Sequence, residues 1–361
     1  MRVGIVGLPN VGKSTLFNAL TKNYAAEAAN FPFCTIEPNI GMVNVNDPRL
    51  EQIRAAVNGQ KVIPAVCEFI DIAGIVEGAS KGEGLGNKFL ANIREANAIL
   101  QVVRIFKNDD IIHVNGKVDP KSDIEIINSE LILADIETLQ RRIIDNSKKA
   151  KSSKEAQLSQ NVYERVMKDL NEGKLVIDLG LSEDEQEYFK DLHLLTNKKF
   201  VYAANVSEDM MDESEEKLKE ILGITNPNTK VVPVCAKLES DMIEMNDDER
   251  IEFLNEMGLI TTGLDNLIKS SYDALGLQYY FTAGEKEVRA WTIPVGATAP
   301  QAAGVIHTDF EKGFIKADVV NAKDLIEFGG WNGAREKAKV SLQGKDYIVK
   351  DGDIMLFKFA N

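Results

Sequence analysis

Residues 7–15, with the sequence GLPNVGKST, match the pattern G-x-x-x-x-G-K-[ST] of a phosphate-binding loop. Its two glycines carry no Cβ, so the backbone can turn its N–H groups toward phosphate oxygens. The Lys13 ammonium would reach the outer phosphates of a nucleotide, and the Ser14 hydroxyl would be a ligand of Mg²⁺. The stretch therefore predicts a site that binds nucleotide phosphates together with Mg²⁺.

The segments on either side of this loop fit the same interpretation. Residues 2–6 form a short apolar run that predicts a buried strand. Leu16, Phe17 and Leu20 follow the loop at helical spacing. The loop is therefore expected between a strand and the N-terminus of a helix, where the positive end of the helix favours phosphate.

Two further positions could serve the phosphates. Residues 71–74 (DIAG) match the pattern D-x-x-G at the end of a predicted strand. Asp71 would act on Mg²⁺ through a bound water, and the N–H of Gly74 would meet the γ-phosphate. Thr35 is a candidate second ligand of Mg²⁺, which prefers few protein ligands plus phosphate oxygens. The alternative for Thr35 is an ordinary loop threonine.

The group that activates water is harder to identify. Ile75 occupies the place at which Ras-type GTPases carry a water-orienting glutamine, and an isoleucine cannot take that role. His113, in a polar segment after the predicted strand at 98–104, could orient or partly deprotonate water near neutral pH. The alternative is an exposed loop histidine without a catalytic role.

The expected base-reading segment is Asn205-Val206-Ser207-Glu208, where GTPases usually carry N-K-x-D. The aspartate of that pattern accepts two hydrogen bonds from guanine, and the longer side chain of Glu208 displaces the carboxylate. An asparagine such as Asn205 can still address N6 and N7 of adenine. Residues 235–237 (CAK) resemble the S-A-K loop that supports the base. These residues predict a weakened preference for guanine without establishing ATP.

Length and composition limit the class of protein. With 361 residues, two or three domains are expected. The net charge of −14 argues against bulk attraction to nucleic acid, so any RNA contact needs a local basic patch. The three cysteines are far apart without a C-x-x-C pair, which favours a reducing compartment without a zinc site. We expect neither a membrane span nor a secretion leader.

The order of the predicted elements indicates a doubly wound, mostly parallel α/β sheet. Strands are expected at 62–71, 98–104, 200–205 and 231–235, and each ends where a chemically interesting group begins. Because ligands bind at the carboxyl ends of such strands, this arrangement brings the motifs together. We assign residues 1–120 and 198–276 to this nucleotide-binding domain.

Residues 121–197 are predicted to form an inserted pair of antiparallel helices. Two apolar stripes at helical spacing flank a polar, lysine-rich link at 147–154. This basic tip is either a solvated loop or a contact for RNA or a partner. Residues 277–361 hold short strand signals separated by Gly and Pro, which predict a small α+β domain.

Taken together, these motifs resemble a known family. Residues 30–39 (NFPFCTIEPN) and 71–86 (DIAGIVEGASKGEGLG) resemble the switch regions of the Obg superfamily. Combined with the Asn205–Glu208 pattern, the helical insertion and the C-terminal domain, the whole chain resembles the YchF family of Obg-like ATPases. The resemblance implies a P-loop ATPase fold with a coiled-coil insertion at 121–197 and a ubiquitin-like TGS domain at 277–361.

The resemblance also implies roles for individual residues. Lys13 and His113 would be catalytic, Ser14 and Thr35 would bind Mg²⁺, and the backbone of Val206 would touch the adenine. The residues that would bind the nucleotide are Asn10, Val11, Gly12, Lys13, Ser14, Thr15, Asn205, Val206 and Glu208.

We therefore expect a cytoplasmic, Mg²⁺-dependent ATPase that hydrolyses ATP to ADP and phosphate as a conformational switch. The resemblance implies association with the ribosome, as the large subunit or the whole particle, in translation or stress regulation. RNA contacts are expected through the basic tip at 148–154 and the TGS domain, without a membrane partner. Two alternatives remain: a GTPase of the same fold, and a nucleotide-gated ribosome-binding module whose turnover is incidental.

Overall fold

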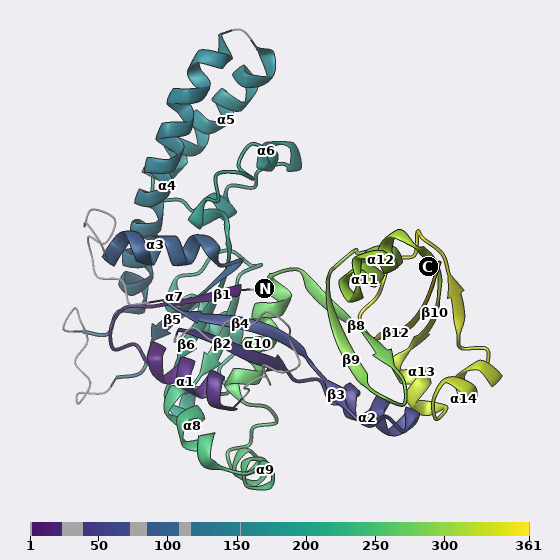
Figure 1. Ribbon diagram of the computed structural model, residues 1–361. Coiled ribbons are helices and arrows are strands. Elements are labelled where there is room, and N and C mark those ends of the chain that lie inside the picture. The colour runs from purple at the N-terminus through teal and green to yellow at the C-terminus, as the bar shows by residue number, and fades with distance from the viewer. Residues whose placement is uncertain (1, 24–38, 73–84, 108–116, 152, 361) are drawn as a thin grey trace. The chain divides into compact units, whose positions relative to one another are not determined.

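The computed structural model describes residues 2–23, 39–72, 85–107, 117–151 and 153–360 (Figure 1). The chain forms two compact units, each of which is described by itself. The first unit holds the described residues of 1–23, 36–41 and 68–274, and the second unit holds those of 42–67 and 275–361. Within these described ranges, no helix combines the length and apolarity needed to cross a membrane.

A six-stranded sheet carries the glycine-rich loop. Its strand order is β2 (Ile40–Val45), β4 (Ala65–Asp71), β1 (Arg2–Val6), β5 (Ala98–Arg104), β6 (Lys199–Asn205) and β7 (Lys230–Val234). The four pairings from β4 to β7 are all parallel. Every residue of β5 is buried, as expected for a central strand covered on both faces. The predicted doubly wound, mostly parallel sheet is confirmed.

Helices α1 (Lys13–Asn23), α3 (Leu85–Glu95), α7 (Glu215–Leu222), α8 (Ala236–Asp241), α9 (Asp247–Glu256) and α10 (Gly263–Ala274) belong to the first unit. Helix α10 packs on strands β5, β6 and β7. Helix α8 packs on α1, which brings the segment after β7 close to the segment after β1. The chain passes from β1 to β2 and β4 on one side of β1, and it then crosses to β5 on the other side. Ligands of doubly wound sheets bind at such a switch point.

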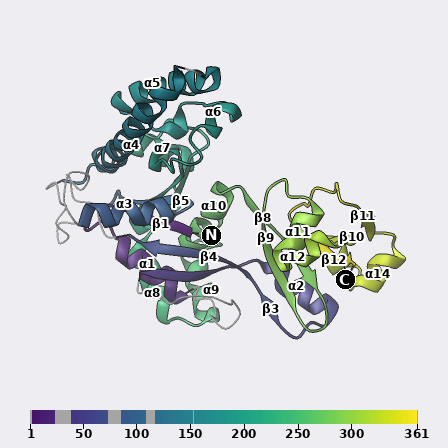
Figure 2. The same ribbon diagram turned by 45° about the horizontal axis from the view of Figure 1, so that its top comes forward.

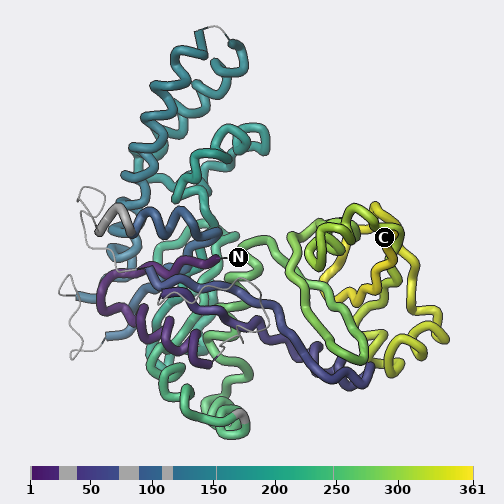
Figure 3. Tube along the Cα trace, in the orientation of Figure 1, coloured from purple at the N-terminus to yellow at the C-terminus, as the bar shows by residue number. Residues whose placement is uncertain are grey.

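The inserted helical hairpin consists of α4 (Pro120–Ala150) and α5 (Lys154–Asn171), and it extends away from the sheet (Figures 2 and 3). Side chains at both N-termini cap the first turn: Asp119 accepts from the N–H of Ser122, and Ser153 from that of Ala156. The buried carboxylate of Asp135 in α4 accepts one hydrogen bond from the backbone N–H of Leu195 and one from that of Thr196, each at 2.8 Å. The predicted antiparallel hairpin is therefore confirmed, and its base is fixed by buried hydrogen bonds.

The second unit is built on a mixed sheet with the order β11 (Ser341–Gln343), β10 (Phe314–Asn321), β12 (Asp353–Phe359), β8 (Leu277–Ala283), β9 (Val288–Pro294) and β3 (Val62–Ile63). Helix α11 (Ala299–Ile306) places Ala299, Ala302 and Ala303 in its core. The remaining helices of this unit are α2 (Pro48–Val57), α12 (Thr308–Lys312), α13 (Ala322–Glu327) and α14 (Trp331–Glu336). The predicted α+β character of the C-terminal part is confirmed.

Residues 42–67 cluster with this C-terminal part. Strand β3 pairs with β9 in parallel, and the Arg49 guanidinium binds the Asp351 carboxylate with a closest distance of 2.8 Å. The Tyr279 hydroxyl donates to Asp47 at 2.6 Å. The two compact units thus differ from the domains expected from the sequence, in which residues 42–67 belong to the nucleotide-binding domain. The domain bounds expected from the sequence stay a prediction.

Candidate functional site

The glycine-rich loop connects β1 to α1, as the motif requires. Asn10 and Gly12 both adopt left-handed backbone conformations, with φ of 63° and 95°. A Cβ at Gly12 would collide with the side-chain amide of Asn205, so glycine is needed there for space as well as for φ. The N–H of Leu16 donates to the Gly12 carbonyl at 2.9 Å, which begins the helix directly behind the loop. The backbone N–H groups that come before Leu16 at the start of α1 have no carbonyl acceptor within the helix.

Lys13 and Asp71 come from the two motifs identified in the sequence, and the structure brings them together. The Lys13 Nζ atom forms an ion pair with Oδ1 of Asp71, the last residue of β4. The Lys13 side chain is 9% exposed, and that of Asp71 is 21% exposed. An ammonium in this partly buried place beside the glycine-rich loop can bind phosphate oxygens strongly, because water screens it little.

The other loop residues divide into exposed and buried groups. Asn10, Ser14 and Thr15 are exposed to solvent. Val11 is buried, and its carbonyl is used inside the protein. The Ser14 hydroxyl and the Asp71 carboxylate are oxygen donors of the kind that Mg²⁺ prefers. Ser14 and Asp71 therefore have the chemistry that suits a hard cation such as Mg²⁺.

The Asn205 side chain links the glycine-rich loop to the segment after β7. Its buried side chain donates from Nδ2 to the Val11 carbonyl at 2.8 Å and accepts the N–H of Ala236 at 3.1 Å. The amide nitrogen carries a second hydrogen, and an Asn side chain can donate both. Asn205 thus holds the glycine-rich loop against the segment after β7, in addition to the nucleotide-binding role expected from the sequence.

Val206 follows Asn205 in the same buried environment. Its N–H donates to the carbonyl of Val234 at 3.0 Å, and its side chain is buried. The expected contact of its backbone with adenine is therefore restricted to the Val206 carbonyl, because the N–H is already used.

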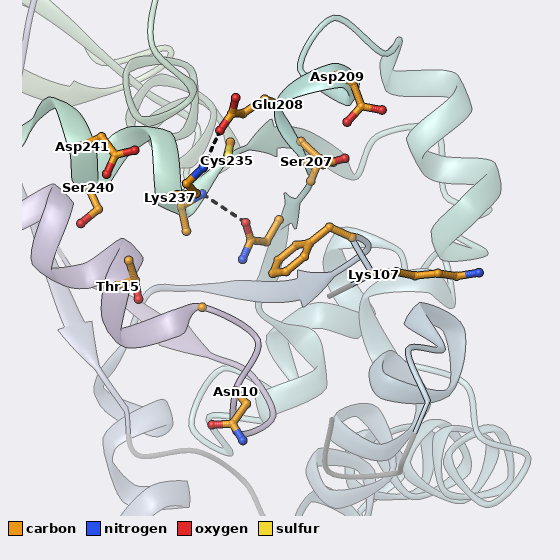
Figure 4. Close-up of a pocket in the computed structure, with 15 residues that line it drawn as sticks. Asn10, Thr15, Lys107, Ser207, Glu208, Asp209, Cys235, Lys237, Ser240 and Asp241 are labelled. Carbon is orange, nitrogen blue, oxygen red and sulfur yellow. Dashed lines mark hydrogen bonds and ion pairs between the residues drawn. The ribbon is translucent and has the colours of Figure 1, made fainter. Parts of the chain in front are cut away.

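Glu208 begins the short 3₁₀ turn η4 (Glu208–Met210), and Lys237 lies in α8. Their side chains form an ion pair at the wall of the pocket, with 3.0 Å between Lys237 Nζ and Glu208 Oε1 (Figure 4). The hydrogen bond to Glu208 raises the pKa of Lys237. Nearby, burial raises the pKa of the Cys235 thiol, which keeps it neutral and of low reactivity.

Part of the glycine-rich loop and the segments after β6 and β7 line a pocket of roughly 590 Å³, a size typical of small-molecule sites. We call residues 10–15 with Asp71 the glycine-loop side, and residues 205–209 and 235–237 with Phe106 the β6–β7 side. The pocket is lined by Asn10, Gly12, Thr15, Phe106, Lys107, Asn205, Val206, Ser207, Glu208, Asp209, Cys235, Ala236, Lys237, Ser240 and Asp241.

Phe106 was missed in the sequence analysis. It lies two residues after the end of β5 and lines the pocket. The fully buried Arg104 supports it: the guanidinium lies 4.6 Å from the centre of the Phe106 ring, and Nε donates to the Phe106 carbonyl at 3.1 Å. An aromatic ring held in this way offers a flat surface on which a nucleobase can stack. The available signal was an aromatic residue at the carboxyl end of a central strand.

Four residues singled out in the sequence fall outside the described residues, namely Thr35, Gly74, Ile75 and His113. Their expected roles therefore stay predictions. The residues that the structure does bring together are the glycine-rich loop, Asp71, the Asn205–Glu208 segment and the 235–237 segment.

Comparison with known proteins gives matches over the whole chain. Residues 277–360 match the family model YchF-GTPase_C, described as a protein of unknown function (DUF933), and residues 2–134 match MMR_HSR1, described as a 50S ribosome-binding GTPase. Proteins named "Ribosome-binding ATPase YchF" from Escherichia coli O157:H7 and Bacillus subtilis are 55% and 52% identical, over 99% of both chains in each case. A solved structure of the Schizosaccharomyces pombe YchF GTPase is 37% identical, with a TM-score of 0.88 over 99% of this chain and 97% of that one.

Proposed function

The chain belongs to the YchF family, and we propose that it is a Mg²⁺-dependent ATPase whose nucleotide state controls its binding to the ribosome. A P-loop fold and relatives named as ATPases support hydrolysis of a nucleotide. The observation that carries the proposal is a single pocket at the carboxyl ends of the strands, in which the glycine-rich loop faces a base segment that departs from N-K-x-D.

We assign the phosphates of the nucleotide to the glycine-loop side. The backbone of Asn10–Thr15 would hold them, and Lys13 would leave Asp71 to bind the outer phosphates. Ser14 and Thr35 would be the protein ligands of Mg²⁺, and Asp71 would act through a water. When bound, the cation neutralises part of the phosphate charge. Hydroxyl and carboxylate oxygens at this position support the assignment.

The base is assigned to the β6–β7 side. The second N–H of Asn205, the Val206 carbonyl and Glu208 would address adenine, with Phe106 as the stacking surface. The names of relatives differ on the base, since the bacterial proteins are named ATPases and the fission yeast structure is titled a GTPase. Binding of ATP is favoured here because Glu208 replaces the aspartate that reads guanine.

For hydrolysis we propose His113 as the residue that orients the attacking water, because Ile75 cannot do so. This role rests on the sequence and on family membership. The alternative of a nucleotide-gated module predicts that His113→Ala abolishes hydrolysis while ribosome binding and cellular function stay intact. An enzyme whose turnover matters would lose its cellular function in the same variant.

The ribosome is the proposed partner, and the cytoplasm the proposed place of action, because the relatives are named ribosome-binding. The basic tip of the helical hairpin is one candidate contact for RNA. Four exposed lysines lie there, namely Lys148, Lys149, Lys151 and Lys154. Positive charge at the tip of a chain with a net charge of −14 supports a local contact with phosphate groups. The C-terminal TGS part is a second candidate.

The test is a calorimetric titration of the full chain with nonhydrolysable analogues of ATP and GTP, each with Mg²⁺. Tighter binding of the ATP analogue is expected. Binding of the GTP analogue at least tenfold tighter than that of the ATP analogue would overturn the proposal and favour a GTPase of the same fold.

A further inference from the structure

The Glu208–Lys237 ion pair lies where a guanine-specific protein would keep a free carboxylate. In the N-K-x-D pattern, the acidic side chain accepts from both N1–H and N2–H₂ of guanine, which takes both carboxylate oxygens. Here Lys237 binds Oε1 of Glu208 at 3.0 Å. The carboxylate therefore has one oxygen engaged and its charge compensated before any base arrives.

The backbones that carry these two side chains are held together by buried hydrogen bonds. The N–H of Ala236 donates to Asn205 Oδ1 at 3.1 Å, and the N–H of Val206 donates to Val234 O at 3.0 Å. Each residue of the ion pair is thus within two positions of a fixed cross-link. The pair consequently joins two segments that are held together on the β6–β7 side, although the side chains themselves are exposed.

We propose that Lys237 is a specificity-determining residue, which disfavours guanine nucleotides by holding the Glu208 carboxylate. This inference rests on the proposed function, namely that ATP is the substrate. A guanine base would have to displace the ammonium to gain its two hydrogen bonds. Adenine has no N1–H or 2-amino group and requires no such displacement.

Lys237 could instead act only as a positive charge that attracts any triphosphate. That effect would be the same for ATP and GTP, because both carry the same phosphates. The ratio of the two affinities therefore separates the mechanisms: electrostatic attraction leaves the ratio unchanged, and release of Glu208 changes it in favour of GTP. Asp241, which lies on the same helix and lines the same pocket, also interacts with the Lys237 charge, but it is present in both titrations of each variant.

The test is Lys237→Met in the full chain, titrated with the Mg²⁺ complexes of nonhydrolysable ATP and GTP analogues. The ratio of the GTP affinity to the ATP affinity should rise roughly two- to fivefold, the range expected for an exposed ion pair. Lys107→Met is the matched control, because Lys107 lines the same pocket and its substitution removes the same charge. The control should leave the ratio unchanged.

A second variant shows whether the effect passes through Glu208. In a Glu208→Gln background, Lys237→Met should no longer change the ratio, since the carboxylate that it releases is absent. An unchanged ratio in Lys237→Met alone would overturn the inference while the ATPase proposal stands. A wild-type preference for GTP would instead overturn the ATPase proposal, so the two failures are distinguishable.

Discussion

Lys13 on the glycine-loop side and Lys237 on the β6–β7 side are both paired with a carboxylate, but their surroundings differ. The side chain of Lys13 is 9% exposed, and that of Lys237 is 75% exposed. On the glycine-loop side, the buried Lys13 lies in the loop between the exposed residues Asn10, Ser14 and Thr15. On the β6–β7 side, the Glu208–Lys237 pair is exposed on short helical segments, whereas Asn205 and Val206 are buried.

The difference indicates how the two parts of a nucleotide are recognised. In the proposed assignment, phosphate binding depends on the backbone path of the loop with its two left-handed residues, and this path cannot change without refolding that segment. In the same assignment, the contribution of Glu208 and Lys237 to the choice of base depends on exposed side chains, which can change at little cost in stability. A fold shared with GTPases can therefore accept ATP through a few substitutions on the β6–β7 side.

The largest effect is expected from Lys13→Met. Loss of the buried ammonium should lower kcat/KM for ATP hydrolysis roughly 10²- to 10³-fold, the range for removal of one charge-stabilising group. Phosphate release measured at a series of ATP concentrations tests this. The control is Lys237→Met, whose turnover should stay within about tenfold of wild type, since an exposed pair contributes little. Turnover of Lys13→Met within threefold of wild type would contradict the division between the two sides.

The next effect is expected from Asn205→Ala, which acts on both sides at once. The substitution leaves the Val11 carbonyl and the Ala236 N–H without their buried partner. Each unpaired group costs about 1–3 kcal/mol, so the free energy of unfolding should fall by about 3 kcal/mol in total. Urea unfolding followed by circular dichroism measures this. Asn171→Ala removes an exposed hydrogen bond to Met167 and should change stability by less than about 0.5 kcal/mol.

The contrast between the sides also explains what could be predicted from the sequence. Residues 7–15 and Asp71 were identified because a loop that binds phosphate needs fixed residue types at fixed spacing. The two hydrogen bonds of the Asn205 side chain were not predicted, since its partners Val11 and Ala236 come from segments far apart in the chain. Phe106 was missed for the same reason: the pattern around it marks a strand end, and only the fold brings it into the pocket.

The second unit is another example of an arrangement that the sequence did not reveal. The sequence predicts short strands at the C-terminal end, but it does not indicate that residues 42–67 join them. That association depends on long-range backbone bonds, such as Gln60 N–H to Glu285 O at 3.0 Å and Val288 N–H to Lys61 O at 2.8 Å. Local periodicity carries no information about such partners. Long-range pairing is therefore the part of the fold that sequence reasoning did not supply.

A smaller, pH-dependent effect is expected at Glu239, in the helix that carries Lys237. Burial raises the pKa of Glu239 to about 7, with a hydrogen bond from the Leu264 N–H and Arg250 acting against the shift and Asp265 adding to it. Because this folded-state pKa is above the unfolded value near 4.5, the contribution to stability is complete below that value and is lost as the pH rises through 7.

Glu239→Gln should remove this dependence. Relative to wild type, the variant should gain about 2 kcal/mol in free energy of unfolding between pH 5 and pH 8. Urea unfolding at several pH values measures the gain. Glu252→Gln is the control, because Glu252 is exposed on α9 and its substitution should leave the pH profile unchanged. An identical profile for wild type and Glu239→Gln would show that the buried carboxyl does not hold its proton.

The smallest effect, in terms of free energy, is expected from charge reversal at the hairpin tip. Changing Lys148, Lys149 and Lys151 to Glu should weaken ribosome binding about tenfold and reduce its dependence on salt, because fewer counterions are released from RNA. Cosedimentation with ribosomes at several salt concentrations measures both. The affinity for the ATP analogue should not change, since the tip contributes no residue to the pocket. Ribosome binding that survives the reversal unchanged would exclude the tip, and a loss of nucleotide affinity would show that the hairpin and the pocket are coupled.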